Sequence, residues 1–209
     1  MPSLSSAAVA GLAQLLNDER VDPAVKELLL RKYPADTNRD LYRVFVEHSW
    51  SVAEASVKLA QQVGADVVFV WEAAWLHDIG IKYTHAPGIF CFGDEPYLRH
   101  GIIGRKLCEG VGLKRHGLVC ERHVGTGISG HDVEAQGLPL PARDMLCVSL
   151  EERVICFADQ FFSKSTLGVV PLEEVSRRIR RHGEASWSRF QEMNKEFGNL
   201  SFLPESKQA

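Results

Sequence analysis

The chain has 209 residues, of which 45% are hydrophobic and 24% are charged, and its formal net charge is −3. This length predicts one domain with a single hydrophobic core. The composition excludes a disordered, collagen-like or coiled-coil chain, and the slightly acidic charge argues against a nucleic-acid polymer as a partner.

Helical periodicity dominates the chain from its beginning. Two short helices are predicted over 4–16 and 23–30. A long helix is predicted from Thr37 or Asn38 to about residue 63, because its apolar residues recur mostly every three or four positions. Gly64 then ends that helix.

The rest of the chain continues with helices separated by glycine-containing loops. The segment 67–79 is apolar nearly all round, so we expect a buried helix there. The segment 125–144 contains four glycines and two prolines and is predicted to be a loop. The remaining predicted helices cover 98–109, 115–123, 150–162 and 172–196.

No segment predicts a membrane span. The most apolar stretch, 67–76, contains Glu72 and has about half the length that a helix needs to cross a bilayer. No Lys or Arg precedes the apolar part of the N-terminal segment, so a secretory signal is not expected. The five cysteines include no CxxC spacing, which favours reduced thiols and a cytoplasmic location.

His77 and Asp78 lie at the end of the apolar helix, in the segment LHDIG. Neighbouring helical residues point about 100° apart, so both can bind one ion most easily near a helix end, which Gly80 supplies. A buried carboxylate beside a buried imidazole is costly unless something pairs them. Taken alone, this pair fits either a metal site or a His–Asp hydrogen bond in the core.

His48 and Asp159 extend this pair. His48 lies on the core-facing side of the long helix, and Asp159 stands in the apolar run VICFADQFF. An unpaired carboxylate at that depth needs a cation or an arginine. Together with His77 and Asp78 they offer two nitrogens and two carboxylates, a set that suits Mn, Fe, Co, Ni or Zn.

Two further histidines have similar settings. His100 lies near the start of a helix in RHGIIGRKL, and His123 lies near the end of one in ERHVGTG. If both point inward, they can hold a second ion, with Asp78 bridging the two ions by its two oxygens. Two ions about 3.5–4 Å apart would make a shared water a nucleophile near neutral pH. Considered singly, each histidine also fits a surface or helix-terminal position.

The pattern H…HD…D, formed here by His48, His77, Asp78 and Asp159, resembles the HD superfamily of metal-dependent phosphohydrolases, in which LHDIG is a common form. The two further histidines are similar to those of its two-metal branch, H…HD…H…H…D. That branch includes the HD-GYP cyclic-dinucleotide phosphodiesterases, myo-inositol oxygenase and a phosphonate-cleaving oxygenase. The ligands that the resemblance implies are His48, His77, Asp78 and Asp159 for a first ion, and Asp78, His100 and His123 for a second.

The chain departs from HD-GYP proteins, because no GYP follows the HD segment and HDIGK reads HDIGI, with Lys82 one residue later. Cyclic di-GMP is therefore not supported as a substrate, and the closest likeness is to small stand-alone HD proteins. The resemblance implies an all-α fold, a single HD-domain helical bundle with short N-terminal helices and a C-terminal helix. The expected division is an N-terminal helical extension (1–36), the HD domain (37–165), and a C-terminal helix and tail packed on the same domain (166–209).

Four side chains are candidates for binding a substrate phosphate, which would need cations for the oxygens that the ions do not hold. Lys82 and His85 follow the HD motif in a glycine-rich loop, and Lys82 is also predicted to be catalytic, together with Asp78. Arg122 could serve the same end or form an ion pair at the surface. Lys164 lies just past the Asp159 helix, where it could face the pocket mouth.

Glu72 precedes His77 in the same apolar helix, and we expect it to orient a ligand imidazole as a hydrogen-bond acceptor. His116, His131 and His182 are predicted to lie at the surface.

The leading hypothesis is hydrolysis of a phosphate ester of a nucleotide or other small phosphorylated metabolite by a metal-activated hydroxide. The expected cofactor is one or two divalent ions (Fe, Mn, Zn, Ni, Co or Mg). The expected partner is the small-molecule substrate, with no nucleic-acid polymer and no membrane, in a monomer or homodimer. Two alternatives remain: a di-iron oxygenase, because the ligand sets are alike, and a metal-dependent nucleotide-binding module without turnover.

Overall fold

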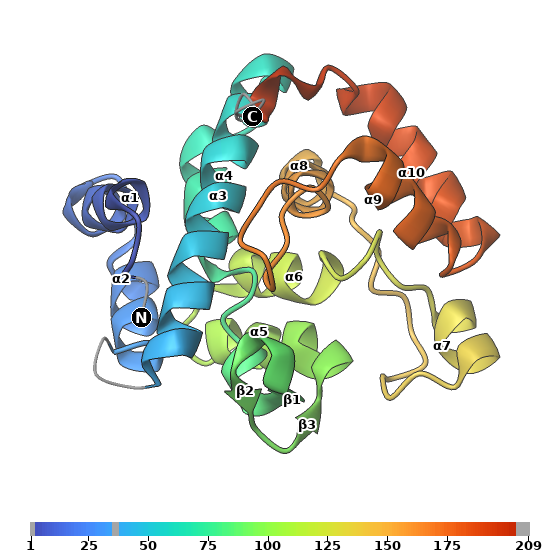
Figure 1. Cartoon of the computed structure of the whole chain (residues 1–209), viewed down its shortest axis with the longest axis horizontal. Coiled ribbons are helices and arrows are strands. Elements are labelled where there is room, and N and C mark those ends of the chain that lie inside the picture. The colour runs from blue at the N-terminus through green and yellow to red at the C-terminus, as the bar shows by residue number, and fades with distance from the viewer. Residues whose placement is uncertain (1–2, 35–37, 204–209) are drawn as a thin grey trace.

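The computed structural model describes residues 3–34 and 38–203. Within them lie ten α-helices, four short 3-10 helices and one small three-stranded sheet (Figure 1). The prediction of an all-α fold is confirmed. No helix in this part of the chain combines the length and hydropathy needed to cross a membrane. Thr37, one of the two predicted starts of the long helix, lies outside the described residues, as does the tail from Pro204.

Side-chain caps define the first helices. Asp22 caps α2, whose first residue is Pro23, and Asn38 caps α3 by accepting a hydrogen bond from the backbone N–H of Leu41 (3.2 Å). Gly64 ends α3 with a φ of +73°, a conformation that glycine adopts without strain. The bounds are α1 (Ser6–Asn17), α2 (Pro23–Lys32), α3 (Arg39–Val63) and α4 (Val67–Leu76).

The core lies where α3, α4 and α8 (Leu150–Asp159) meet, with α3 and α4 running side by side (Figure 1). All residues from Phe69 to Leu76 in α4 are buried, as expected for a helix that is apolar all round. On α8, Phe157 packs against aromatic rings of the C-terminal part of the chain. Full burial of such a ring contributes about 1.5–3 kcal/mol, so this packing holds α8 firmly against the bundle.

Glycines allow α5 (His100–Glu109) to pack closely on its neighbours. A Cβ on Gly101 would lie 2.6 Å from the carbonyl oxygen of Cys120 in α6 (Lys114–Arg122), and one on Gly80 would lie 2.2 Å from that of His100. Both contacts are shorter than a carbon atom permits. These glycines therefore bring the start of α5 against both α6 and the turn that follows α4.

The segment that follows α4 differs from the prediction. The α4 helix ends at Leu76 rather than continuing to residue 79, and a 3-10 helix (Ile81–Tyr83) leads into the sheet. The sheet has the order β2-β1-β3, with β1 antiparallel to β2 and parallel to β3. Strands of two or three residues leave no period in the sequence, so a loop was predicted here. Their bounds are β1 (Thr84–Ala86), β2 (Cys91–Phe92) and β3 (Glu95–Pro96).

Two predictions for the second half of the chain, one of a loop and one of a helix, are also corrected. The predicted loop 125–144 contains the short helix α7 (Gly130–Gln136), which begins at a capping box formed by Ser129 and Asp132. The predicted helix 172–196 is two helices, separated at Gly183, whose φ is +99°. The helix cannot continue through that conformation. The two helices are α9 (Leu172–Arg180) and α10 (Glu184–Phe197).

Candidate metal centre

The structure brings together the six side chains that the sequence suggested as metal ligands. They come from the middle of α3, the turn after α4, the first residue of α5, the C-terminal end of α6 and the last residue of α8. Five are buried, and the sixth, Asp159, has a side chain that is 12% exposed. The residues, in that order, are His48, then His77 and Asp78, then His100, His123 and Asp159.

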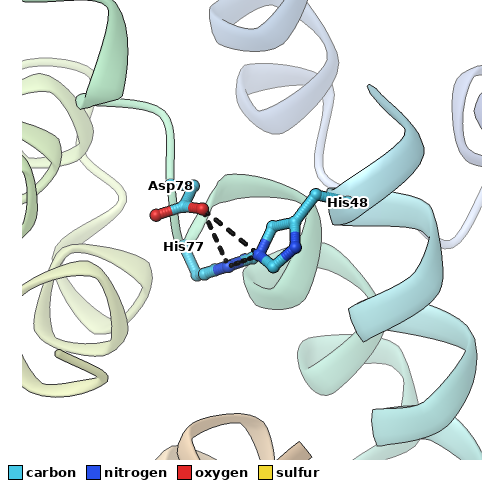
Figure 2. A group of neighbouring side chains, drawn as sticks. All are labelled: His48, His77 and Asp78. Carbon is cyan, nitrogen blue, oxygen red and sulfur yellow. Dashed lines mark hydrogen bonds and ion pairs between the residues drawn. The ribbon is translucent and has the colours of Figure 1, made fainter. Parts of the chain in front are cut away.

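One group of ligand atoms surrounds the Oδ2 atom of Asp78. The Nε2 atoms of His48 and His77 lie 3.2 Å apart, and each is 3.3 Å from this oxygen (Figure 2). Asp159 completes the group, with its Oδ1 atom 2.9 Å from Nε2 of His48. A tetrahedral ion about 2.1 Å from each ligand separates neighbouring ligand atoms by about 3.4 Å. The atoms of His48, His77 and Asp78 therefore have the spacing of ligands around one ion, and Oδ1 of Asp159 lies near enough to both imidazoles to be a fourth ligand.

A second group surrounds the other oxygen of Asp78. The Nε2 atoms of His100 and His123 lie 3.3 Å apart, and they are 3.4 and 3.5 Å from Oδ1 of Asp78. The two oxygens of one carboxylate thus face two separate pairs of imidazoles. Such an arrangement allows Asp78 to bridge two cations.

The backbone orients three of the four imidazoles. Nδ1 of His77 donates to the carbonyl oxygen of Ala74 (2.6 Å), that of His100 to Tyr97 (2.7 Å), and that of His123 to Cys120 (2.8 Å). A carbonyl oxygen only accepts, so in each neutral ring Nδ1 carries the proton and Nε2 offers a lone pair. In the pair formed by His100 and His123, both Nε2 atoms then carry lone pairs at 3.3 Å with no proton between them, and a cation held by both would remove the repulsion.

Unpartnered carboxylate oxygens support the same interpretation. Both oxygens of Asp78 and Oδ1 of Asp159 are buried and accept no hydrogen bond of good geometry from the described residues. Their charge is balanced instead by an ion pair, because Nζ of Lys164 lies 2.8 Å from Oδ2 of Asp78. Buried carboxylate oxygens facing lone-pair nitrogens form a donor set that fits divalent metal ions.

The electrostatics keep the carboxylates ionised. Burial alone would raise the pKa of Asp78 and of Asp159, but Lys164 and the neighbouring histidines outweigh it and hold both well below their usual range. Burial lowers the pKa of His48 to about 4, whereas at His77 the two aspartates outweigh burial and raise the pKa to about 9. At neutral pH the metal-free centre thus holds charged carboxylates, a neutral His48 and a protonated His77.

A pocket of about 430 Å³ opens beside these residues. His100, His123 and Asp159 form part of its wall, so a ligand in the pocket reaches the centre directly. Apolar side chains from the segment after β1 and from α9 line another part. Lys164 and Arg178 are cationic residues on the wall, and the imidazole of His182 also lines the pocket.

Residues 45–163, more than half of the chain, match the HD domain family. The chain belongs to the HD domain family. The resemblance predicted from the motif is confirmed, and the six clustered side chains occupy the positions of the pattern H…HD…H…H…D.

This chain is 29% identical over 164 residues to the uncharacterized protein MJ0778 of Methanocaldococcus jannaschii. The alignment covers 74% of this chain and 88% of that protein. The chain is 30% identical over 156 residues to a tRNA (cytidine(56)-2'-O)-methyltransferase of Thermoplasma volcanium, again 74% of this chain but 40% of the relative. Among solved structures, the HD domain of the L. monocytogenes phosphodiesterase PgpH aligns with 89% of this chain and 90% of its own, at 15% identity and a TM-score of 0.48.

Within this HD domain, the predicted phosphate-binding residues have different locations. Lys164 lies at the centre and on the pocket wall. Lys82 does not reach the centre: its ammonium group donates to the carbonyl oxygen of Lys32 (2.7 Å) and lies over the ring of Tyr33. His85 is exposed on β1 and is not among the residues that line the pocket. The 3-10 turn after the HD motif directs both Lys82 and His85 away from the centre.

Arg122 also departs from the prediction. Its Nη1 atom donates to both carboxylate oxygens of Glu152 (2.9 and 3.0 Å), and Glu152 belongs to the capping box at the start of α8. The neighbouring Glu121, a potential partner in the sequence, binds Arg105 and Arg143 instead. Arg122 thus ties α6 to α8 and is not among the residues that line the pocket.

Glu72 and His116 correct two further predictions. Glu72 accepts hydrogen bonds from Nε2 of His116 (2.9 Å) and from the backbone N–H of Asp22 (2.6 Å), so it does not orient a ligand imidazole. His116 is buried rather than at the surface. His182 is exposed as predicted, but it lines the pocket, as does Arg178. Nothing in the run RRIRRH distinguishes these two positions, because their direction depends on how α9 packs.

Proposed function

We propose that this HD domain protein is a metal-dependent phosphohydrolase that cleaves a phosphate ester of a nucleotide or another small phosphorylated metabolite. The observation that carries the proposal is the position of Asp78, whose two oxygens face separate imidazole pairs within 3.3–3.5 Å. This carboxylate could contribute one oxygen to each of two divalent ions, beside a pocket that Lys164 and Arg178 line.

The six side chains form two overlapping sets of ligands, one for each ion. Two divalent cations, when bound, would polarise the phosphoryl oxygens and lower the pKa of a water molecule toward neutrality. The backbone carbonyls that accept from the Nδ1 atoms keep three of the rings oriented, so their Nε2 atoms already face the oxygens of Asp78. The residues that would hold the first ion are His48, His77, Asp78 and Asp159, and those for the second are Asp78, His100 and His123.

The pocket residues would bind and orient the substrate. Lys164 is the cation nearest the centre and would neutralise a phosphoryl oxygen that the ions leave uncovered. Ile89, Phe162 and Ile179 line an apolar part of the pocket, which suits the organic group of the ester. A volume of about 430 Å³ is in the range of pockets that enclose a small metabolite or a nucleotide.

The test is phosphate release from a panel of nucleotides and sugar phosphates by protein loaded with Mn²⁺, under anaerobic conditions. We expect turnover of at least one ester without O₂, and none by the Asp78→Asn variant. Elemental analysis of the native protein accompanies the panel. Substrate-dependent O₂ uptake with two bound irons would instead support the oxygenase. Tight nucleotide binding with no product over hours would support a binding module.

A further inference from the structure

Arg178 is an arginine on the pocket wall that has no acidic partner. Its hydrogen bonds go to the carbonyl oxygen of Gln160 (2.8 Å) and to the Oε1 atom of the same residue (3.3 Å). No carboxylate of the described residues forms an ion pair with it, whereas Arg122 and Arg189, which are similarly half-buried, each bind one. A half-buried guanidinium that faces a pocket without a counter-ion is a binding position for an anion.

Gln160 holds this guanidinium in place. Gln160 is 4% exposed, and its Nε2 atom donates to the carbonyl oxygens of Gly125 (2.6 Å) and Cys156 (3.1 Å). These bonds fix the amide so that Oε1 faces Arg178. Both bonds from Arg178 use the single Nη2 atom. Its Nε and Nη1 donors therefore have no acceptor among the described residues and remain available to a ligand in the pocket.

This position is distinct from the metal centre. Lys164 already supplies the cation at the centre, within 4 Å of both Asp78 and Asp159, and Arg178 contacts neither carboxylate. His182, four residues after Arg178, also lines the pocket. The pocket thus presents one cation beside the ligand cluster and a second basic position along another element.

We infer that Arg178 binds a second phosphate group of the substrate, while the first lies at the metal centre. The substrate class is then a small bisphosphorylated metabolite or nucleotide. The placement of the first phosphate rests on the proposed function. A charge-assisted, planar pairing of this kind changes affinity by about 10- to 100-fold.

The test compares phosphonates, whose carbon–phosphorus bonds a phosphohydrolase does not cleave. Calorimetry measures binding of propylphosphonate and of α,ω-alkylene diphosphonates with three to six carbons to the Mn²⁺-loaded protein. The flexible series covers a range of separations between the two groups. We expect the best diphosphonate to bind at least about 10-fold more tightly than the monophosphonate. In Arg178→Gln this preference should disappear, while the monophosphonate affinity stays within about two-fold.

Two further variants keep the test decisive. Arg181→Gln changes an exposed neighbour that is not part of the pocket wall and should keep the preference. Arg178→Lys keeps the charge and should retain part of the preference for the diphosphonate. It also gives a result if Arg178→Gln folds poorly. An equal loss for both ligands in Arg178→Gln, or no preference in the unaltered protein, overturns the second phosphate position. If the monophosphonate itself does not bind, the proposed function fails together with the inference.

Discussion

The ammonium group of Lys164 lies 2.8 Å from Oδ2 of Asp78, the oxygen that the Nε2 atoms of His48 and His77 also face. The same group is 3.7 Å from Oδ1 of Asp159. One internal cation therefore lies between two carboxylates and weakens the repulsion between them. Lys164 gives the chain a way to fold before any divalent ion is bound.

Replacing Lys164 by Met is expected to have opposite effects on metal-free stability and on metal affinity. The metal-free variant leaves Asp78 and Asp159 with only the histidines as partners and should lose roughly 3 kcal/mol of stability. Metal binding should strengthen by about 10-fold, because the ion no longer shares these oxygens with an ammonium group. Thermal unfolding in chelator and Mn²⁺ titration measure the two effects.

Lys58→Met is the matched control for this prediction, because Lys58 is a half-buried lysine that pairs with Glu54 on α3, away from the metal centre. It should change neither quantity appreciably. Weaker metal binding by Lys164→Met would contradict the internal counter-ion.

Removing single ligands should separate the two metal positions. His123→Ala takes one nitrogen from the group around Oδ1 of Asp78 and should lose one ion while keeping the other. Asp78→Ala removes an oxygen from both groups and should lose both ions. His77→Ala should lose only the first ion, the one near Oδ2 of Asp78. Elemental analysis after dialysis gives the stoichiometry. His131→Ala, an exposed histidine on α7, serves as the control. Full metal content in Asp78→Ala is incompatible with the assignment.

Lys82 is expected to contribute to stability and not to chemistry. Its ammonium group binds the carbonyl of Lys32 at the end of α2, a contact worth about 0.5–1.5 kcal/mol. Lys82→Met should lower stability by that amount in urea denaturation and retain its full metal content. If it instead lost activity with stability and metal content unchanged, the catalytic role predicted from the sequence would be restored.

Asp132 should give the stability of the region around α7 a pH dependence. Burial raises the pKa of this carboxyl group, but hydrogen bonds from Ser129 and the ion pair with Arg189 (2.8 Å) outweigh it and lower the pKa. The folded pKa therefore lies below the unfolded value of about 3.9. The stabilisation is complete above that value and is lost as the pH falls through the folded pKa.

Asp132→Asn should accordingly cost about 1–2 kcal/mol at neutral pH, and the difference from the unaltered protein should shrink in acid. Urea denaturation of both proteins at neutral pH and near pH 3 measures it. A difference that grows as the pH falls would show that the interaction with Arg189 is not the cause.

Local sequence signals were sufficient to predict a feature where nearby residues cause it. A cap before α3 and a glycine after it define that helix, and a single acid in an apolar run marks Asp159 as a residue that needs a cation. Where the cause is distant, prediction failed. The pairing of β1 with β2 and β3 depends on strands too short to show alternation. The break between α9 and α10 is different, because it lies at Gly183, a local signal that permits a positive φ but does not require one.

The sequence by itself determined which side chains are able to bind metal, because a histidine or aspartate inside an apolar helix face must be buried and must find a partner. Only the tertiary structure decided which lysine and arginine side chains lie near these ligands. Lys82 and Arg122 stand next to the motifs but bind Lys32 and Glu152, whereas Lys164 and Arg178 reach the pocket. Long charged side chains can turn toward several partners, and the choice is made by packing between helices that are far apart in the chain.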